Sequence, residues 1–452
     1  MPRKLFGTDG IRGVAGEFPL DAATTYALGV ALGGWAAHLD PQPEVLVGMD
    51  TRESGPWLAG QVAGGLARAG VRTRFAGLIT TPGVAHLTRT GPFVAGVMIS
   101  ASHNPYRDNG IKVFSHSGYK LPDQQEHALE QEMFALLEAG VSGEPAALEI
   151  DEGLDRSYLD HLASTFHGSL QGMRMVIDAA NGAASHLAPE LFTRLGAEVH
   201  AIGCSPNGRN INLASGAMHV EALRSEVLAR GADIGVAFDG DADRAIFVAR
   251  SGKIVDGDGV LFVAARRMHA AGRLGKPAVV ATVMSNIGLE RALAADGIAL
   301  IRAAVGDKYV LEEMRRSGIA LGGEQSGHVI FLDHATTGDG MLTALRVVEI
   351  MSQTGLGLDE LTANLKIYPQ VLVNVRVASR QPLEKLPAVM AEIRATEASL
   401  GAAGRVLVRF SGTEPLVRVM LEGPEQVEVE RLARRIAGAI QAEIGAEDSK
   451  EK

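Results

Sequence analysis

The residues best suited to do chemistry lie in short polar loops that follow apolar stretches. One of them, residues 100–105, reads SASHNP and follows the apolar run Phe93–Ile99. Ser102 would lie beyond the carboxyl end of a strand, where open α/β sheets bind ligands. We expect a surface loop in which Ser102 is a nucleophile or phosphate carrier, with His103 nearby. An ordinary turn closed by Pro105 is the alternative, and the loop alone does not decide between them.

Three aspartates alternate along the sequence DGDADR, residues 239–244, directly after the apolar run Ile234–Phe238. Asp239, Asp241 and Asp243 would repel one another, so they need a cation or strong hydrogen bonds. A turning backbone can aim all three at a hard divalent ion. A calcium loop of the EF-hand type is excluded, because arginine replaces both its required Gly and its final Glu. A capped, solvent-exposed turn remains the alternative.

A third loop, residues 322–328, reads GGEQSGH and follows another predicted strand. Glu324 and Ser326 offer a carboxylate and a hydroxyl that suit the hydroxyl groups of a sugar, and His328 adds an imidazole. A glycine-rich turn with incidental polar side chains explains the same residues equally well.

A fourth loop, residues 409–415, reads RFSGTEP and leaves an apolar strand near the C-terminus. Its hydroxyls, backbone amides and flanking guanidiniums would make an anion-binding nest, unless it is a simple hairpin turn. The glycine-rich N-terminal sequence GTDGIRG, residues 7–13, similarly places Arg12 where it could reach an anion or only solvent. The candidate anion ligands of the fourth loop are Arg409, Ser411, Gly412, Thr413 and Arg418.

Apolar runs alternate with amphipathic segments over most of the chain, which predicts βαβ units with helix-covered parallel sheets. After Pro369 the pattern changes to adjacent short strands and two helices, which predicts a smaller α+β domain. The predicted strands are 44–48, 71–76, 93–99, 173–178, 198–202, 234–238, 278–282, 299–304, 319–321, 371–377, 406–410 and 417–421, and the predicted helices are 57–69, 187–195, 220–229, 287–295, 308–316, 383–400 and 425–442. The predicted domains are 1–155, 156–256, 257–369 and 370–452.

Composition and missing motifs exclude several classes of protein. The 452 residues are 46% hydrophobic and 21% charged, which excludes large-scale disorder, and a net charge of −10 argues against a nucleic-acid binder. The single cysteine, Cys204, excludes a disulfide framework and is interpreted as a packed residue. Dinucleotide, P-loop and α/β-hydrolase motifs are absent. We expect a cytoplasmic protein with no membrane partner, because neither a secretory signal nor a spanning segment is visible.

Taken together and in order, these loops make the chain similar to the α-D-phosphohexomutase family. The resemblance runs from Gly7 to Arg418 and includes SASHNP, DGDADR, GEQSGH and RFSGTEP. Any one of these motifs is moderately specific, and all of them in the family's order are very specific. The resemblance implies three similar α/β domains with mixed, mainly parallel sheets and a smaller, mobile C-terminal α+β domain, arranged around a central cleft.

The resemblance also implies a chemistry for the serine and aspartate loops. Ser102 would carry a phosphoryl group, and Mg²⁺ would be held by Asp239, Asp241 and Asp243 together with a phosphate oxygen on Ser102. The phosphorylated enzyme would donate this group to a sugar phosphate and form a sugar 1,6-bisphosphate intermediate. The bisphosphate would then turn around and return its other phosphate to the serine.

Charged residues near these loops would assist the transfer. Arg12, Lys112 and Arg244 would neutralise phosphate charge, which is the main demand of phosphoryl transfer. A serine needs a general base, and Lys112 and His328 are the candidates, although the ordinary pKa of lysine, about 10.4, fits a base poorly. His103 is placed in the same catalytic group.

The sugar loop indicates the substrate through the same resemblance. Gln325 resembles the amino-sugar branch, which predicts interconversion of glucosamine 6-phosphate and glucosamine 1-phosphate, feeding UDP-N-acetylglucosamine and cell-wall synthesis. Glu324 and Ser326 would bind sugar hydroxyls. Lys308 departs from the family's pattern, where arginine is expected, so a bidentate contact there is in doubt. The alternatives are the glucose- and mannose-phosphate branch, a phosphoserine-dependent phosphomonoesterase and a non-catalytic sensor; the expected partners are sugar phosphates and, as one option, a second copy of the chain.

Overall fold

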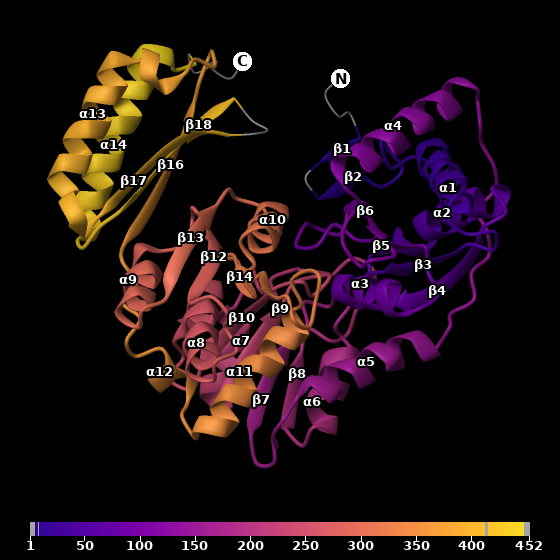
Figure 1. Cartoon of the computed structure of the whole chain (residues 1–452), viewed down its shortest axis with the longest axis horizontal. Helices are drawn as coiled ribbons and strands as arrows, with labels where there is room; N and C mark the ends of the chain where they lie inside the picture. The colour runs from indigo at the N-terminus through magenta and orange to yellow at the C-terminus, as the bar shows by residue number, and fades with distance from the viewer. Residues whose placement is uncertain (1–4, 8, 412–414, 447–452) are drawn as a thin grey trace. The chain divides into compact units, whose positions relative to one another are not determined.

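The N-terminal part of the chain forms a six-stranded mixed sheet with helices against it (Figure 1). The computed structural model describes residues 5–7, 9–411 and 415–446. The strand order is β1-β2-β6-β5-β3-β4, in which β3 is parallel to β4 and β5, while β6 is antiparallel to β5. The elements are β1 (Phe6–Gly7), β2 (Gly10–Val14), α1 (Ala22–Ala37), β3 (Glu44–Met49), α2 (Gly55–Arg68), β4 (Arg72–Leu78), α3 (Thr81–Thr90), β5 (Ala95–Ile99), β6 (Asp108–Ser115) and α4 (Asp123–Glu138).

Local signals explain where these elements begin. Asp21 caps α1 by accepting a hydrogen bond from the backbone N–H of Thr24 at 2.9 Å, and Thr80 caps α3 in the same way through Gly83. Strand β5 is buried along its whole length, as expected for a central strand covered on both faces. The core of this sheet is a continuous apolar cluster that includes Leu32 and Val47.

The second sheet has five strands in the order β11-β10-β9-β7-β8. Strands β7, β8 and β9 are parallel neighbours, and β10 returns antiparallel to β9. Helix α7 ends at Gly231, whose left-handed φ of 57° provides an ordinary C-terminal cap. The elements are α5 (Gly153–Thr165), β7 (Arg174–Asp178), α6 (Leu187–Arg194), β8 (Glu198–Ile202), α7 (Glu221–Arg230), β9 (Ile234–Phe238), β10 (Ala245–Ala249) and β11 (Ile254–Val255).

The third sheet has four strands in the order β13-β12-β14-β15. Strand β12 is parallel to β13 and β14, and β15 returns antiparallel to β14. Asp339 caps the buried helix α11 by accepting a hydrogen bond from the N–H of Leu342 at 2.9 Å. The elements are α8 (Gly257–Ala270), β12 (Ala278–Thr282), α9 (Ile287–Ala295), β13 (Ala299–Ala303), α10 (Asp307–Ser317), β14 (Leu321–Gly323), β15 (Val329–Phe331), α11 (Gly340–Thr354) and α12 (Leu358–Leu361).

The C-terminal sheet is antiparallel, in the order β16-β18-β17, and two long helices accompany it. Its core is separate from the others and is built from apolar residues such as Val419 and Ile436. The elements are β16 (Gln370–Arg376), α13 (Pro387–Leu400), β17 (Arg405–Phe410), β18 (Leu416–Glu422) and α14 (Gln426–Ile444). This sheet belongs to a compact unit that comprises Ser285–Gly297, and therefore α9, and the chain from Asn364 onward. The other unit contains the first three sheets, with the chain up to Met284 and Ile298–Ala363.

The prediction of three α/β domains with mixed sheets and a smaller α+β domain is confirmed. Strands β8, β9 and β12 and helix α9 have the predicted bounds, and most other predicted elements agree within a few residues. The sequence analysis did not assign β6, β10 or β15. These are the strands that return antiparallel beside β5, β9 and β14. Each of the three sheets therefore has a parallel centre and an antiparallel side.

The return strands explain how the candidate loops are held. Each loop connects two hydrogen-bonded antiparallel neighbours: β5 and β6, β9 and β10, β14 and β15, or β17 and β18. Each of the first three loops is fixed at both ends by the same strand pair, so its side chains are placed by the sheet. Within the described ranges, no helix has the length and apolar character needed to cross a bilayer.

Candidate active site

Ser102 lies in the loop between β5 and β6 in an unusual backbone conformation. Its φ is 52°, in the left-handed region that a non-glycine residue adopts at a cost of about 1–3 kcal/mol and that is often found at functional sites. The side chain is only 2% exposed, so the expectation of a surface loop was wrong at this residue. Its hydroxyl donates a 2.6 Å hydrogen bond to Oδ2 of Asp239, which brings the serine and aspartate loops together.

A buried arginine holds the serine loop in this conformation. Arg52 forms an ion pair with Asp50, with Nε 3.0 Å from Oδ2, and both side chains are fully buried. The same guanidinium donates to the carbonyl oxygens of Ser102, Asn104, Pro105 and Asp108. The loop backbone thus wraps around a single cation that is neutralised by one carboxylate.

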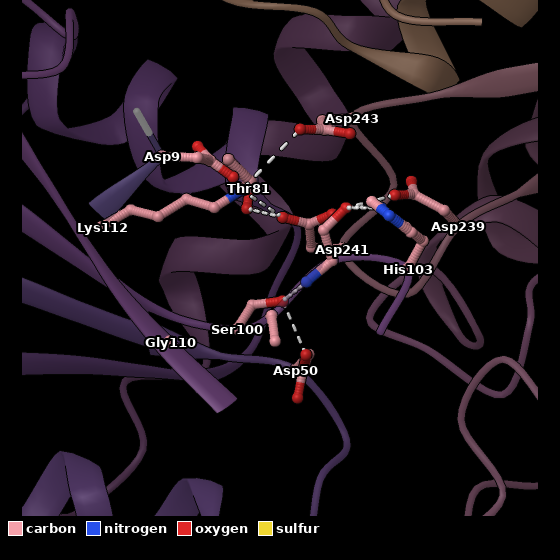
Figure 2. Close-up of polar contacts among 12 residues, drawn as sticks. Asp9, Asp50, Thr81, Ser100, His103, Gly110, Lys112, Asp239, Asp241 and Asp243 are labelled. Carbon is pink, nitrogen blue, oxygen red and sulfur yellow. Dashed lines mark hydrogen bonds and ion pairs between the residues drawn. The ribbon is translucent and has the colours of Figure 1, made fainter. Parts of the chain in front are cut away.

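Two further polar residues complete this support. Ser100 donates to Asp50 at 2.6 Å (Figure 2). It also accepts the backbone N–H of Ser102 at 2.9 Å. Asn212, from the connection between β8 and α7, donates to the Ser102 carbonyl at 2.9 Å. Sequence reasoning missed Asp50, Arg52 and Asn212. The available signal was the charged sequence after strand 44–48, because β3 is the parallel neighbour of β5 and ends at the same edge.

The three aspartates of the second loop gather around one point. One carboxylate oxygen from each of Asp239, Asp241 and Asp243 lies within 4.8 Å of the others, and all three residues are buried. Ala242 has a φ of 57°, so the loop turns sharply between the last two. Gly240 approaches the serine loop so closely that a Cβ there would lie 2.5 Å from the Ser102 carbonyl oxygen.

These carboxylates fit a divalent metal ion. Oδ1 of Asp241 and Oδ1 of Asp243 are buried and accept no hydrogen bond from the described residues. Hard oxygen ligands with free lone pairs are what Mg²⁺ and similar ions take. Burial, together with the charges of Asp243 and Asp241, raises the pKa of Asp239 to about 8.

Lys112 extends from β6 into this negative cluster (Figure 2). Its Nζ lies 2.9 Å from Asp241, 3.2 Å from Asp9 and 3.8 Å from Asp243. Burial alone would lower the pKa of Lys112, but these carboxylates outweigh burial and hold the pKa well above its ordinary value. The side chain is therefore an ammonium, which fits charge neutralisation and disfavours a role as general base.

His328 has both ring nitrogens occupied. The backbone N–H of Gly338 donates to Nε2 at 3.0 Å, and Nδ1 lies 3.6 Å from Asp243. Burial would lower the pKa of His328, and the opposing attraction of Asp243 raises it. The Gly338 contact requires a lone pair on Nε2, however, so the geometry assigns a neutral ring with its proton on Nδ1. In this arrangement His328 holds Asp243 and has no free nitrogen to act as a base.

The remaining predicted catalytic residues also lie near the cluster. His103 Nδ1 is 3.4 Å from Ser102 Oγ, and burial together with the charges of Arg244 and Arg12 lowers the pKa of His103 to about 4. Arg244 donates its backbone N–H to Asp239, and its Nε lies 3.8 Å from Asp243. Arg12 pairs with Asp9 and reaches the carbonyl of Ala101 at 3.5 Å.

The sugar loop between β14 and β15 presents partly exposed polar groups. Glu324 accepts the backbone N–H of Gly306 at 3.0 Å, and the hydroxyl of Ser326 donates to Glu324 at 3.3 Å. Burial raises the pKa of Asp256, and a hydrogen bond from the Gln325 side chain is among the contacts that oppose this shift. Gln325, which the sequence analysis used to predict an amino sugar, therefore has a partner within the protein.

The C-terminal hairpin of β17 and β18 carries two of the predicted anion ligands. Arg409 and Arg418 are directly opposite each other on β17 and β18, so two like charges share one face of the hairpin. Burial and the charge of Arg418 lower the pKa of Arg409. Ser411 is buried, with its backbone N–H donated to Leu416 at 2.8 Å. Two neighbouring guanidinium groups favour the binding of an anion. Gly412 and Thr413 lie outside the described residues.

Cys204 has the character expected of a packed residue. Burial raises the pKa of its thiol to about 11, so the group is a neutral thiol at physiological pH.

Family models cover most of the chain. Those of the phosphoglucomutase/phosphomannomutase family match its α/β/α domain I at residues 3–139, domain II at 156–252, domain III at 256–368 and the C-terminal domain at 372–439. The chain is 62% identical to the phosphoglucosamine mutase of Solibacter usitatus over 98% of this chain and 100% of that relative. It is 52% identical to that of Koribacter versatilis, over 98% of each.

Solved structures show the same fold. A phosphoglucomutase/phosphomannomutase family protein from Burkholderia thailandensis superposes with a TM-score of 0.79 at 24% identity, covering 96% of this chain and 97% of that one. The Aspergillus fumigatus N-acetylphosphoglucosamine mutase, solved with GlcNAc-6P and magnesium, gives a TM-score of 0.66 at 19% identity, covering 97% of this chain and 96% of that one.

The support of the serine loop by Arg52 generates a stability prediction. Arg52→Met should leave Asp50 buried without its partner and release the loop carbonyls, which costs roughly 3–5 kcal/mol. A thermal melt should show a drop of roughly 10 °C in Tm. Arg72→Met is the matched control, because Arg72 pairs with Glu44 at the surface and should cost less than about 1 kcal/mol. Equal melting temperatures for the two variants would contradict the role given to Arg52.

Proposed function

Because the chain belongs to the phosphoglucomutase/phosphomannomutase family, we propose that it interconverts glucosamine 6-phosphate and glucosamine 1-phosphate. Its full-length relatives at 62% and 52% identity are phosphoglucosamine mutases. The observation that carries the chemistry is the 2.6 Å hydrogen bond from the Ser102 hydroxyl to Asp239, inside the cluster of three aspartates. A hydroxyl at the rim of a metal-binding cluster suits a residue that alternately carries and releases a phosphoryl group.

The proposed cofactor is Mg²⁺, with phosphorylated Ser102 as the active form of the enzyme. Asp239, Asp241 and Asp243 would hold the ion, and a phosphate oxygen on Ser102 would add a ligand. When bound, the ion neutralises phosphate charge and polarises the phosphorus–oxygen bond. The A. fumigatus relative in the same fold was solved with magnesium, which supports the choice of ion.

In the first transfer the reacting sugar hydroxyl loses a proton, and Ser102 Oγ, the leaving oxygen, regains one. In the return transfer the Ser102 hydroxyl loses its proton, and the sugar oxygen that leaves phosphorus regains one. Lys112 and Arg244 lie beside the aspartates and would neutralise charge on the transferred group, with Arg12 beside Ala101 in the same role. His328 would keep Asp243 in position. We place His103 at the serine, where its neutral ring lies within 3.4 Å of Oγ.

The substrate must be held twice, once in each orientation. We propose that Glu324 and Ser326 bind sugar hydroxyls, and that the C-terminal loop binds the phosphate that is not being transferred. A sugar 1,6-bisphosphate would be the intermediate between the two transfers. The proposed phosphate ligands are Arg409, Ser411, Gly412, Thr413 and Arg418.

Several sequence-based expectations stay predictions. These are the domain bounds at residues 155, 256 and 369, a cytoplasmic location, a homodimer and the supply of UDP-N-acetylglucosamine for cell-wall synthesis.

Ser102→Ala should abolish isomerisation. We expect kcat to fall at least about 1,000-fold because the phosphate carrier is lost. Stability should fall by only about 1 kcal/mol, the usual worth of one hydrogen bond. A coupled assay of isomer formation and a thermal melt measure both, with Ser225→Ala on the exposed surface of α7 as control. A folded Ser102→Ala protein with ordinary turnover would rule out the carrier role.

Removing the metal should stop the reaction reversibly. A chelator should abolish activity, and Mg²⁺ should restore it. Mg²⁺ should also raise Tm, because a ligand present at 100 times its Kd stabilises the folded protein by about 2.7 kcal/mol. Asp241→Asn should lose most of the Tm increase. Asp233→Asn, in a surface ion pair with Arg250, should keep it. Full activity in chelator would show that the aspartates serve another purpose.

The sugar preference can be tested with a substrate panel. We expect kcat/KM for glucosamine 6-phosphate to exceed those for glucose and mannose 6-phosphate by at least about tenfold, a difference of about 1.4 kcal/mol. Release of inorganic phosphate is followed in parallel. A higher value for glucose or mannose phosphate would favour the other branch of the family, and phosphate release without isomer would indicate a phosphomonoesterase.

A further inference from the structure

A series of ion pairs with alternating charges runs from the catalytic cluster to the start of helix α10. Asp9 contacts Lys112 at 3.2 Å through one carboxylate oxygen and Lys120 through the other. Lys120 Nζ in turn lies 2.6 Å from Asp307, the first residue of α10. The order is therefore Asp241, Lys112, Asp9, Lys120 and Asp307, and each charge contacts charges of the opposite sign.

The two lysines of this series of ion pairs lie on hydrogen-bonded backbone. Lys112 lies in β6, and the backbone of Lys120 pairs antiparallel with Phe114 of the same strand. The backbone N–H of Leu121 donates to the carbonyl of Val113 at 3.0 Å. The two lysines are thus held by one hairpin, with the Asp9 carboxylate contacting both ammonium groups.

The last residue in this series of ion pairs, Asp307, is connected to the sugar loop. Asp307 accepts the backbone N–H of Lys308 at 2.8 Å, so its carboxylate is fixed to the first turn of α10. The preceding residue, Gly306, has a φ of 128°, a conformation that favours glycine. Its N–H donates to Oε1 of Glu324 at 3.0 Å. Whatever fixes Asp307 therefore also fixes the donor that orients Glu324.

A second ion pair also joins the chain near the start of α4 to the start of α10, but it lies at the surface. Lys308 pairs with Asp123, the first residue of α4, whose side chain is 61% exposed. In contrast, the side chains of Asp9, Lys120 and Asp307 are 24%, 19% and 20% exposed. Water and salt screen the exposed pair more strongly, so it is expected to contribute little. It provides a natural control for the more buried pair.

We propose that Lys120 and Asp307 are positioning residues that keep the sugar-binding carboxylate of Glu324 aligned with Ser102 and Lys112. The inference rests on the proposed function, because it assumes that Glu324 binds sugar and that Ser102 carries phosphate. Neither positioning residue touches the reacting atoms. Their loss should affect transfer between serine and sugar, which needs both loops, and spare reactions that need the serine loop alone.

The test compares two fates of the phosphorylated enzyme in single turnovers. Enzyme labelled at Ser102 with a sugar 1,6-bisphosphate is mixed with glucosamine 6-phosphate or with buffer alone. In the first case the phosphoryl group passes to the sugar hydroxyl; in the second, water attacks phosphorus, the bond to Ser102 Oγ breaks, and the serine regains a proton as phosphate leaves. The variants are Asp307→Asn, Lys120→Met, Lys120→Arg and the control Asp123→Asn.

Asp307→Asn and Lys120→Met should slow transfer to the sugar at least about tenfold, since small misplacements of reacting groups can cost about 100-fold. Loss of phosphate to water should change less than about twofold. Lys120→Arg, which keeps the charge, and Asp123→Asn should behave like wild type in both reactions. The double variant Lys120→Met/Asp307→Asn should be no slower than the slower single variant.

Three results would overturn the inference. The first is unchanged transfer in Asp307→Asn, and the second is an equal loss of both reactions, which would indicate general damage around Ser102. The third is an Asp123→Asn effect as large as that of Asp307→Asn. A wild-type phosphoenzyme that transfers nothing to the sugar would instead overturn the proposed function itself. Thermal melts of each variant identify any that fail to fold, and whichever of Asp307→Asn and Lys120→Met folds then carries the test.

Discussion

Three buried carboxylates within 4.8 Å of one another set the requirement from which the rest of the polar structure follows. Two unit charges at that distance repel by roughly 3 kcal/mol at an effective dielectric constant of about 20. Lys112 therefore enters the cluster as a cation although it is almost fully buried. Thr81 adds a hydroxyl that donates to Asp241 at 2.5 Å, and Ser102 adds another to Asp239. Oδ1 of Asp241 and Oδ1 of Asp243 accept no hydrogen bond from the described residues and remain open to a metal ion.

The serine loop shows how a strained conformation is kept. Ser102 and Ala242 both have positive φ angles, the first in the serine loop and the second in the aspartate loop. The strain at Ser102 is offset by Arg52, which collects several loop carbonyls around one buried guanidinium and is itself neutralised by Asp50. This arrangement gives the loop one shape before any substrate arrives, as electrostatic preorganisation requires.

Protonation states decide whether the two candidate general bases can accept a proton. Lys112 and His328 were both candidates for the general base, but Lys112 is held as an ammonium and His328 has both nitrogens engaged. Both are better suited to holding charge in place than to moving a proton. The ion pairs that neutralise the aspartates also continue through Asp9 and Lys120 to the first residue of α10.

The sequence by itself determined the local features: the apolar runs that become strands β8, β9 and β12, the alternation that makes α/β units, and the polar loops that follow their strands. These features depend on neighbours a few residues apart, which periodicity and motif spacing record. Only the tertiary structure decided that Ser102 is buried, that Arg52 supports it, and that Lys120 meets Asp307. Those contacts join residues 50 to 187 positions apart, and which distant groups meet is decided by how the sheets pack. Charge states follow the same rule, because burial and the nearest opposite charge set the pKa, and neither is visible along the chain.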